Sequence, residues 1–245
     1  MNAAPQLSPD DKAYARSLVL YEDEFVLVLD KPPNLSSQGG RGQHRTLDDY
    51  LTAFPKASGR RPQLVHRLDR DTSGVILAAR TQPAASFLGK ALMARRFRKT
   101  YLALTPGPLD PAKGEIDVPL RREEQGREAW SRPAAADHPD AQPALTRYRT
   151  LASNKRAALL ELEPVTGRMH QLRVHLQHRG RPILGDTRYG GALMLAGAPV
   201  PRLMLHAQSL SFPHPDGGSR TFEAPLPRDI EAVLAAADLS YAPAP

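Results

Sequence analysis

Residues 66–74 read HRLDRDTSG and are followed by the apolar run VILAA at 75–79. The apolar run has the length and composition of a buried strand, and the Thr-Ser-Gly before it is a typical turn sequence. Asp69 is therefore expected at the mouth of a strand, between Arg67 and Arg70. On these residues alone, Asp69 would form a surface ion pair with one of the two arginines, and such pairs are common and contribute little to stability.

Regular elements are predicted on both sides of this stretch. Residues 17–33 alternate apolar positions around a Glu-Asp pair, which predicts a β-hairpin. Thr46, with Asp49 three residues later, has the pattern of a capping box and predicts a short helix. Apolar residues at helical spacing predict a helix over 82–97, with Arg95 and Arg96 in its last turn. The predicted strands nearby are 62–68, 74–80 and 99–107.

The composition of the chain changes at residue 121. Residues 121–144 are polar and rich in Pro, Ala and charge, which predicts a long mobile loop. Thr166 can cap a helix that begins near Gly167 and stops at Gly180. The predicted strands after this point are 144–152, 156–165 and 202–212. Because strands occur in neighbouring pairs with few helices between them, the pattern indicates an α+β fold with a mixed, mostly antiparallel sheet.

The composition favours a polyanionic partner. The 245 residues carry a formal net charge of +7, and an excess of Lys and Arg is typical of proteins that bind nucleic acid. The chain has no cysteine, which excludes disulfides, thiolate nucleophiles and cysteine zinc sites. It has no nucleotide-binding glycine motif and no histidine spacing typical of a metal site, so we expect no cofactor and no metal. The N-terminus lacks the apolar segment of a secretion signal, and no run approaches a membrane span, which predicts a cytoplasmic protein without a membrane partner.

A second charged region, residues 167–191, gives Asp69 a possible chemical role. In a helix, His170 and Arg173 would share a face because they are three residues apart. An arginine placed against Asp69 would keep the carboxylate ionised and orient it. An ionised, oriented carboxylate is what covalent catalysis at an anomeric carbon requires, and Arg168 would contact phosphate.

Several motifs together resemble the RluA-type pseudouridine synthases. HRLDRDTSGVILAAR is similar to the central motif of that family, and RKTYLAL to its tyrosine-bearing strand. DKPPNLSSQ resembles the first motif, usually written Lys-Pro-x-Gly, although this sequence has Asn34 where the family often has glycine. The C-terminal motifs follow in order at 167–191 and 202–215, so the resemblance spans residues 18–225.

The resemblance implies an RNA-modifying isomerase and a role for each matching residue. Asp69 would be the nucleophile, Tyr101 would stack on the target base and act as a general base, and Arg173 would pair with Asp69. Arg67 and His66 would help to flip the uridine out of its stack and fill its place. Further substrate contacts are predicted for Leu68, Arg168, His170, Leu172, Arg95 and Arg96. The implied fold is the pseudouridine synthase catalytic fold, with a central sheet in two abutting halves flanked by helices and loops.

Two other functions are compatible with parts of the sequence. A non-catalytic RNA-binding or RNA-chaperone module could keep the fold, but it would not need Asp69, Tyr101 and Arg173 together. A glycosidase would use two carboxylates, such as Asp69 and Asp71. The surrounding cations would lower the pKa of the carboxyl that must act as the general acid, which disfavours this function.

The resemblance also predicts the organisation of the chain and its partner. Residues 1–17 are expected to be a flexible tail, 18–230 the catalytic domain and 231–245 a C-terminal tail. A short tail leaves no room for the S4-type RNA-binding domain that many relatives carry. We therefore expect a monomer that modifies a uridine in a stem-loop of transfer or ribosomal RNA, and no DNA partner.

Overall fold

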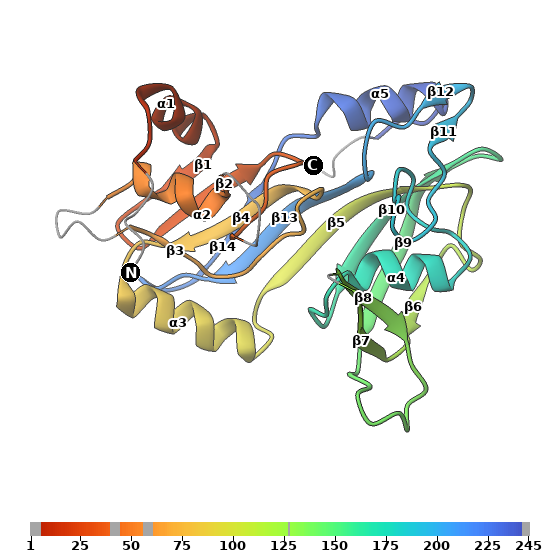
Figure 1. Cartoon of the computed structure of the whole chain (residues 1–245), viewed down its shortest axis with the longest axis horizontal. Coiled ribbons are helices and arrows are strands. Elements are labelled where there is room, and N and C mark those ends of the chain that lie inside the picture. Colours follow the sequence, from red (N-terminus) through yellow and green to blue (C-terminus); the bar gives the residue numbers. More distant parts are fainter. Residues whose placement is uncertain (1–5, 40–44, 56–60, 127, 242–245) are drawn as a thin grey trace. The chain divides into compact units, whose positions relative to one another are not determined.

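The computed structural model describes residues 6–39, 45–55, 61–126 and 128–241. The chain divides into two compact units, and Figure 1 labels the elements of both. The first unit comprises residues 1–98 and 207–225, and the second comprises residues 99–206 and 226–245. Among the described residues, no helix is long and apolar enough to cross a membrane.

The first unit is built on a sheet that contains the predicted strand after the HRLDRDTSG motif. Its strands follow in the order β1 (Val19–Glu22), β2 (Val26–Lys31), β4 (Ser73–Ala79) and β13 (Leu205–Pro213), with β3 (Gln63–Leu64) beside β4 and β14 (Ser219–Glu223) beside β13. All seven residues of β4 are buried, as its apolar run predicts. Gly74 begins this run with φ +111°, and a Cβ there would lie 2.2 Å from the carbonyl oxygen of Ala207. The motif needs glycine at this position because β13 approaches so closely.

Helices complete the core of the first unit. In Figure 1, α3 (Gln82–Met93) runs along the sheet, and Ala84 and Leu88 share a core cluster with Val75, Leu77 and Phe212. The other helical elements of this unit are α1 (Pro9–Ser17), α2 (Leu47–Tyr50) and the 3-10 helix η1 (Leu51–Ala53).

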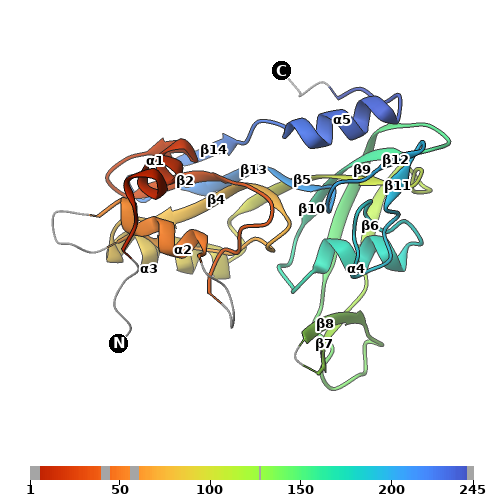
Figure 2. The same cartoon turned by 45° about the horizontal axis from the view of Figure 1, so that its top comes forward.

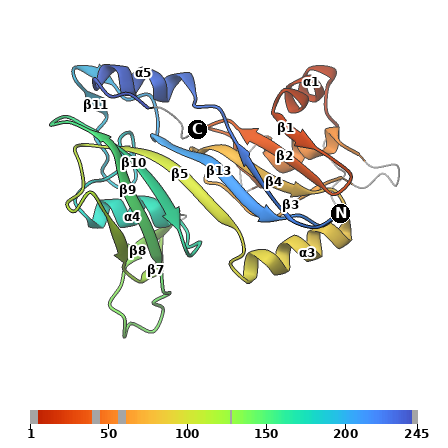
Figure 3. The same ribbon diagram turned by 180° about the vertical axis from the view of Figure 1, so that it is seen from behind.

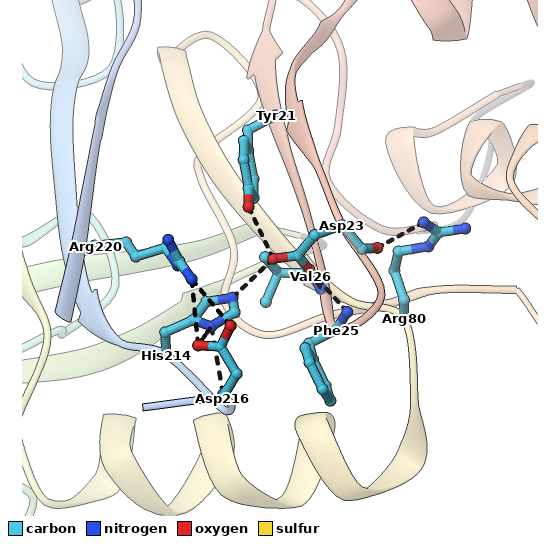
Figure 4. Close-up of polar contacts among 8 residues, drawn as sticks. All are labelled: Tyr21, Asp23, Phe25, Val26, Arg80, His214, Asp216 and Arg220. Carbon is cyan, nitrogen blue, oxygen red and sulfur yellow. Dashed lines mark hydrogen bonds and ion pairs between the residues drawn. The ribbon is translucent and has the colours of Figure 1, made fainter. Parts of the chain in front are cut away.

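A polar cluster around the buried His214 links two turns of the first unit (Figure 4). His214 is enclosed between two carboxylates: its Nε2 lies 3.0 Å from Asp23, and its Nδ1 contacts Asp216. Asp23 also accepts hydrogen bonds from the Tyr21 hydroxyl at 3.0 Å and from the backbone N–H groups of Phe25 and Val26 at 2.8 Å. The turn between β1 and β2 is thereby held against the turn between β13 and β14.

The main strands of the second unit are covered by a helix and a hairpin. These strands follow in the order β5 (Arg98–Thr105), β10 (Ala158–Pro164), β9 (Leu145–Ser153) and β6 (Lys113–Asp117), paired antiparallel. Helix α4 (Gln171–His178) packs on β9 and β10. The hairpin of β7 (Leu120–Gln125) and β8 (Glu128–Pro133) projects beyond α4, away from these strands (Figures 1 and 2).

The last helix closes the second unit. Helix α5 (Arg228–Ala236) lies beside the small hairpin of β11 (Met194–Leu195) and β12 (Ala198–Pro199), as Figure 3 shows from behind. Arg202 holds Asp229 at the start of this helix through two hydrogen bonds of 2.6 and 2.8 Å. The Asn154 amide donates to the carbonyl of Ala237 just after the helix at 2.6 Å.

Most predicted elements are present. The hairpin in residues 17–33 is formed by β1 and β2, and the capping box predicted for Thr46 and Asp49 has both reciprocal hydrogen bonds. The antiparallel hairpins and the few helices agree with the predicted α+β class. The predicted stop at Gly180 is also present, because Gly180 adopts φ +67° directly after α4.

Several local predictions differ from the structure. The segment 121–144, predicted to be a mobile loop, contains the hairpin β7–β8. Residues 9–17, expected to belong to a flexible tail, form α1 with a capping box, and α5 crosses the expected boundary at residue 230. Arg95 and Arg96 lie beyond the end of α3 and not in its last turn. Thr166 does not cap α4, because the N-cap residue is His170 in a left-handed conformation.

Candidate active site

The loop that carries Asp69 is fixed through the backbone of both its neighbours. The buried Ser37 hydroxyl donates to the Leu68 carbonyl at 2.7 Å and accepts from the Leu68 N–H at 3.0 Å. Lys31 donates to the carbonyl of Arg70 at 3.0 Å. The Asp69 carbonyl itself accepts the N–H of Thr72, which closes the turn into β4. Asp69 is thus the half-buried residue at the centre of a loop whose backbone has little freedom.

Lys31 performs this task as a fully buried cation. Its ammonium also donates to the carbonyls of Pro32 and Leu35, both at 2.8 Å, so three backbone oxygens solvate the charge. The loop between these carbonyls requires a left-handed residue, and Asn34 supplies it with φ 63°. Asn tolerates this region better than most residues, so it can adopt the conformation for which glycine is the usual choice.

The other residues of the central motif have different surroundings. His66 is buried, and its Nε2 accepts the backbone N–H of Leu77 in β4 at 3.3 Å. Leu68 is buried, whereas Arg67 is exposed. Of these residues, Arg67 has the exposure that an RNA-contacting side chain needs. The roles of His66 and Arg67 in flipping a base stay predictions.

Tyr101 lies in β5, directly opposite Leu162 of β10, and is buried. Lys99 precedes it by two residues, so both side chains leave the strand on the same face. Burial lowers the pKa of Lys99 to about 8. A phosphate beside this ammonium would stabilise its charged form and raise the pKa again.

Arg173 is buried in α4 and grips a carboxylate that the sequence did not single out. Its Nε donates to Asp186 Oδ2 at 2.8 Å and its Nη2 to Asp186 Oδ1 at 2.7 Å. The exposed fractions of the two side chains are 8% and 0%. The guanidinium carbon also lies 5.0 Å from the ring centroid of Tyr189. The predicted pairing of Arg173 with Asp69 stays a prediction.

The segment before α4 brings three predicted residues close to Arg173 in the chain. Gln171 Oε1 accepts the backbone N–H of Arg168 at 3.0 Å, and Arg168 Nε donates to the Pro143 carbonyl at 3.1 Å. His170 contacts the Tyr189 hydroxyl through Nδ1 at 2.8 Å, and Leu172 is buried. The predicted face shared by His170 and Arg173 is absent, because His170 precedes the helix with φ 53°.

Arg95 and Arg96 lie in the turn that ends α3. Arg95 adopts φ 56°, and the N–H groups of Arg95 and Arg96 donate to the carbonyls of Leu92 and Ala91. This is a Schellman motif with arginine at the position that usually has glycine. Both side chains are exposed, which suits a phosphate contact.

The predicted residues therefore form two groups, one in each unit. Four of them share the loop 66–69 of the first unit, and four share the segment 168–173 of the second unit. Tyr101 lies apart from these groups in β5, and Arg95 and Arg96 lie in the turn after α3. Sequence reasoning missed Lys31, Ser37, Asp186 and Tyr189, although all four lie inside the quoted motifs. No group of His, Cys, Asp and Glu that could hold a metal occurs in the part of the chain that the structure describes.

Known proteins share both the motifs and the fold. The family model described as RNA pseudouridylate synthase matches residues 25–178. The ribosomal large subunit pseudouridine synthase C of Vibrio cholerae is 34% identical over 95% of this chain and 73% of its own length. Synthase D of Xanthomonas campestris is 38% identical over 96% of this chain and 71% of its own length.

A solved structure has the same architecture. Human RNA pseudouridylate synthase domain containing 4 superimposes with a TM-score of 0.80 at 26% identity, over 95% of this chain and 98% of that one. This similarity confirms the predicted fold class. On the family match and on relatives more than 30% identical along most of their length, the chain belongs to the RluA-type RNA pseudouridylate synthases, the isomerases that convert uridine in RNA to pseudouridine.

Proposed function

We propose that this synthase modifies uridines of large-subunit ribosomal RNA, with Asp69 as the nucleophile. The two bacterial relatives described above carry that substrate in their names. The net charge of +7 supports association with a polyanion. A uridine in a stem-loop must leave its stack before a side chain can reach its sugar, so the target base is flipped out.

The reaction is an exchange of one bond to the sugar for another. The Asp69 carboxylate attacks C1′ of the uridine, and the N1–C1′ bond breaks with its electron pair left on the uracil. The uracil turns, its C5 attacks C1′, and the bond to Asp69 breaks. A base removes the C5 proton and N1 gains one, so the product has the same atoms as the substrate. Tyr101 is the candidate for the base.

The immobilised loop around Asp69 is the observation that carries this assignment. Ser37 and Lys31 hold the backbone at Leu68 and Arg70, on both sides of the acid. A nucleophile held in one position avoids the entropic cost of being oriented during the reaction. A surface carboxylate that only formed ion pairs would not need this support. Asp71 serves for comparison: it is half-buried too, and its ion-pair contact with Arg70 is long at 3.9 Å.

The test compares Asp69→Asn with Asp71→Asn. Tritium at C5 of uridine leaves as water when the C5 proton is lost, so its release from labelled ribosomal RNA measures turnover. We expect Asp69→Asn to lose at least about 1,000-fold in rate while RNA affinity stays within about twofold, because the cations supply binding. Asp71→Asn should keep the wild-type rate. Turnover by Asp69→Asn near the wild-type rate would refute the nucleophile.

The substrate needs its own experiment. Transcripts of large-subunit ribosomal RNA domains and a pool of transfer RNA would be offered to the wild-type enzyme under single-turnover conditions. Rapid release from ribosomal transcripts alone supports the proposal, and release from transfer RNA alone contradicts it. The monomeric state, the cytoplasmic location and the lack of a DNA partner stay predictions.

A further inference from the structure

Asp186 is a completely buried acceptor at the centre of the second unit. Its Oδ1 accepts hydrogen bonds from Arg173 Nη2 at 2.7 Å and from the backbone N–H groups of Arg188 and Tyr189, both at 3.0 Å. Its Oδ2 accepts Arg173 Nε at 2.8 Å. Four donors therefore bind this carboxylate, three at Oδ1 and one at Oδ2.

The turn that carries Asp186 is rigid before any contact with Arg173. The two backbone bonds make an Asx turn, in which the side chain mimics a backbone carbonyl. Gly185, at φ +75°, has no room for a Cβ, which would lie 1.8 Å from the Arg202 carbonyl oxygen. A Cβ on Gly191 would lie 1.9 Å from the carbonyl oxygen of Ile183. The backbone thus fixes where the carboxylate stands.

Tyr189 holds the guanidinium of Arg173 from a second direction. The Tyr189 ring lies under the guanidinium, with 5.0 Å between the carbon and the ring centroid. The ring is itself held, because its hydroxyl accepts the Ser131 N–H at 3.0 Å and contacts His170 Nδ1 at 2.8 Å. A planar group held along one edge and on one face cannot rotate.

The hydrogen-bond donors of Arg173 are thereby divided. Of five N–H donors, Asp186 takes the one on Nε and one on Nη2. Since the guanidinium is planar, its Nη1 edge is turned away from Asp186. The direction of that edge is set by Asp186 and not by the flexible stem of the arginine.

We propose that Asp186 is a positioning residue of the synthase, which aims the Nη1 edge of Arg173 at the reacting groups. The inference rests on the proposed function, with Asp69 as the nucleophile, and on the predicted role of Arg173 in orienting Asp69. The negative charge of Asp186 already balances the positive charge of Arg173 within this buried pair. Arg173 then supplies directed N–H groups and no net positive charge, so its orientation matters more than its charge.

The chain contains a matched control for a merely structural ion pair. Arg202 and Asp229 form the same side-on fork within the second unit, with bonds of 2.6 and 2.8 Å, and Arg202 is 5% exposed. That pair anchors α5 and has no proposed chemical role. If Asp186 acts only on stability, breaking either fork should have similar consequences for the reaction.

The experiment removes the acceptor of Arg173 while an acceptor for the Asx turn is kept. Asp186→Asn keeps an Oδ1 acceptor for the Asx turn but puts an NH2 group against Arg173 Nε. Asp186→Ser is the second variant, because a hydroxyl can also close the turn. Both are compared with Asp229→Asn in single-turnover tritium release at saturating RNA. Each enzyme is assayed the same number of degrees below its own melting temperature.

We expect both Asp186 variants to lose about 10- to 100-fold in rate, as a small misplacement of a catalytic group does, with RNA affinity within about twofold. Asp229→Asn should keep the wild-type rate although it melts at a lower temperature. In the double variant of Asp186→Asn with Arg173→Lys, the rate should equal that of the slower single variant, because Asp186 acts through Arg173.

Three results would overturn the inference. They are a wild-type rate for the Asp186 variants, an equal loss for Asp229→Asn, and a double-variant loss equal to the product of the two single losses. The variant Arg173→Ala distinguishes a failure of the role of Asp186 from a failure of the role of Arg173. If it is slow while the Asp186 variants are fast, the inference about Asp186 fails alone. If it keeps the wild-type rate, the role of Arg173 in the proposed function fails as well.

Discussion

Ionisation of Asp30 is expected to lower the free energy of unfolding as the pH rises, whereas most carboxylates in proteins have the opposite effect. The residue lies in β2 beside Lys31 and is half-buried. Burial raises the pKa of Asp30 from its ordinary value of 3.8 to about 6, against the opposing charge of Lys31. This elevation corresponds to about 3 kcal/mol against the ionised form, and partial exposure to water reduces it to about 1–2 kcal/mol.

The sign follows from linkage. Because the pKa of Asp30 is higher in the folded chain, its contribution to stability is full below 3.8 and is lost as the pH rises through about 6. Asp30→Asn carries no charge and escapes this loss. At pH 8 the variant should therefore be more stable than the wild type by about 1–2 kcal/mol, and the difference should shrink as the pH falls from 6 to 4.

Urea unfolding followed by circular dichroism at pH 3, 4, 6 and 8 measures this difference. Asp23→Asn is the matched control in the same unit. Burial raises the pKa of Asp23. Hydrogen bonds from Val26, Phe25 and Tyr21 and the charge of His214 together lower it by more, so the pKa lies below its ordinary value. Asp23→Asn should be less stable than the wild type at pH 8, with a deficit that disappears as the pH falls below 3.8. A pH-independent effect of Asp30→Asn, or a loss of stability at pH 8, would refute the reasoning.

Two predictions concern the reaction and the RNA. Arg173→Ala should reduce the single-turnover rate more than Arg173→Lys, because an ammonium keeps the charge but cannot form two bonds with one carboxylate, and equal rates would contradict an orienting role. Replacing both Arg95 and Arg96 with Ala should weaken RNA binding and flatten the slope of log K against log salt by about one to two, if both contact phosphates. Titrations in the Asp69→Asn background measure that slope without turnover, and an unchanged slope with unchanged affinity would exclude these residues from the RNA path.

Elements with local signals could be predicted from the sequence. The capping box of Thr46 and Asp49 is a contact between residues three apart, and the hairpin of β1 and β2 depends on alternation within one short stretch. The strand at 73–79 contains the continuous apolar run 75–79 because it is buried on both faces. In each case the residues that decide the structure are neighbours in the chain.

The hairpin β7–β8 could not be predicted because its stabilising contacts lie elsewhere. Its strands, LRREEQ and EAWSRP, have no apolar alternation, and an isolated two-stranded hairpin is marginal in water. It is stabilised by Trp130 packed edge-on against Tyr189 at 5.6 Å, and by the bond from the Ser131 N–H to the Tyr189 hydroxyl. The sequence of residues 121–144 alone cannot predict a contact with the distant Tyr189.

The start of α4 was misplaced for a related reason. Thr166 has the composition of an N-cap, but its hydroxyl accepts the N–H of Leu145 and donates to Gln171 Oε1. The chain therefore turns once more, through His170 in the left-handed region, before the helix begins. A tertiary contact with β9 overrides the local preference of threonine.

The same limit explains what was seen and missed around Arg173. Sequence reasoning found the arginine and assigned it the acid that the motifs emphasise, Asp69. It could not find Asp186, because thirteen residues and a tight glycine turn separate the two partners in the chain. A buried arginine with five donors needs more than one acceptor, so a single carboxylate partner was already too few. The donors that Asp69 leaves without an acceptor therefore predict a second carboxylate near Arg173. Within the motif ILGDTRYGG, Asp186 is the one acid that could supply it.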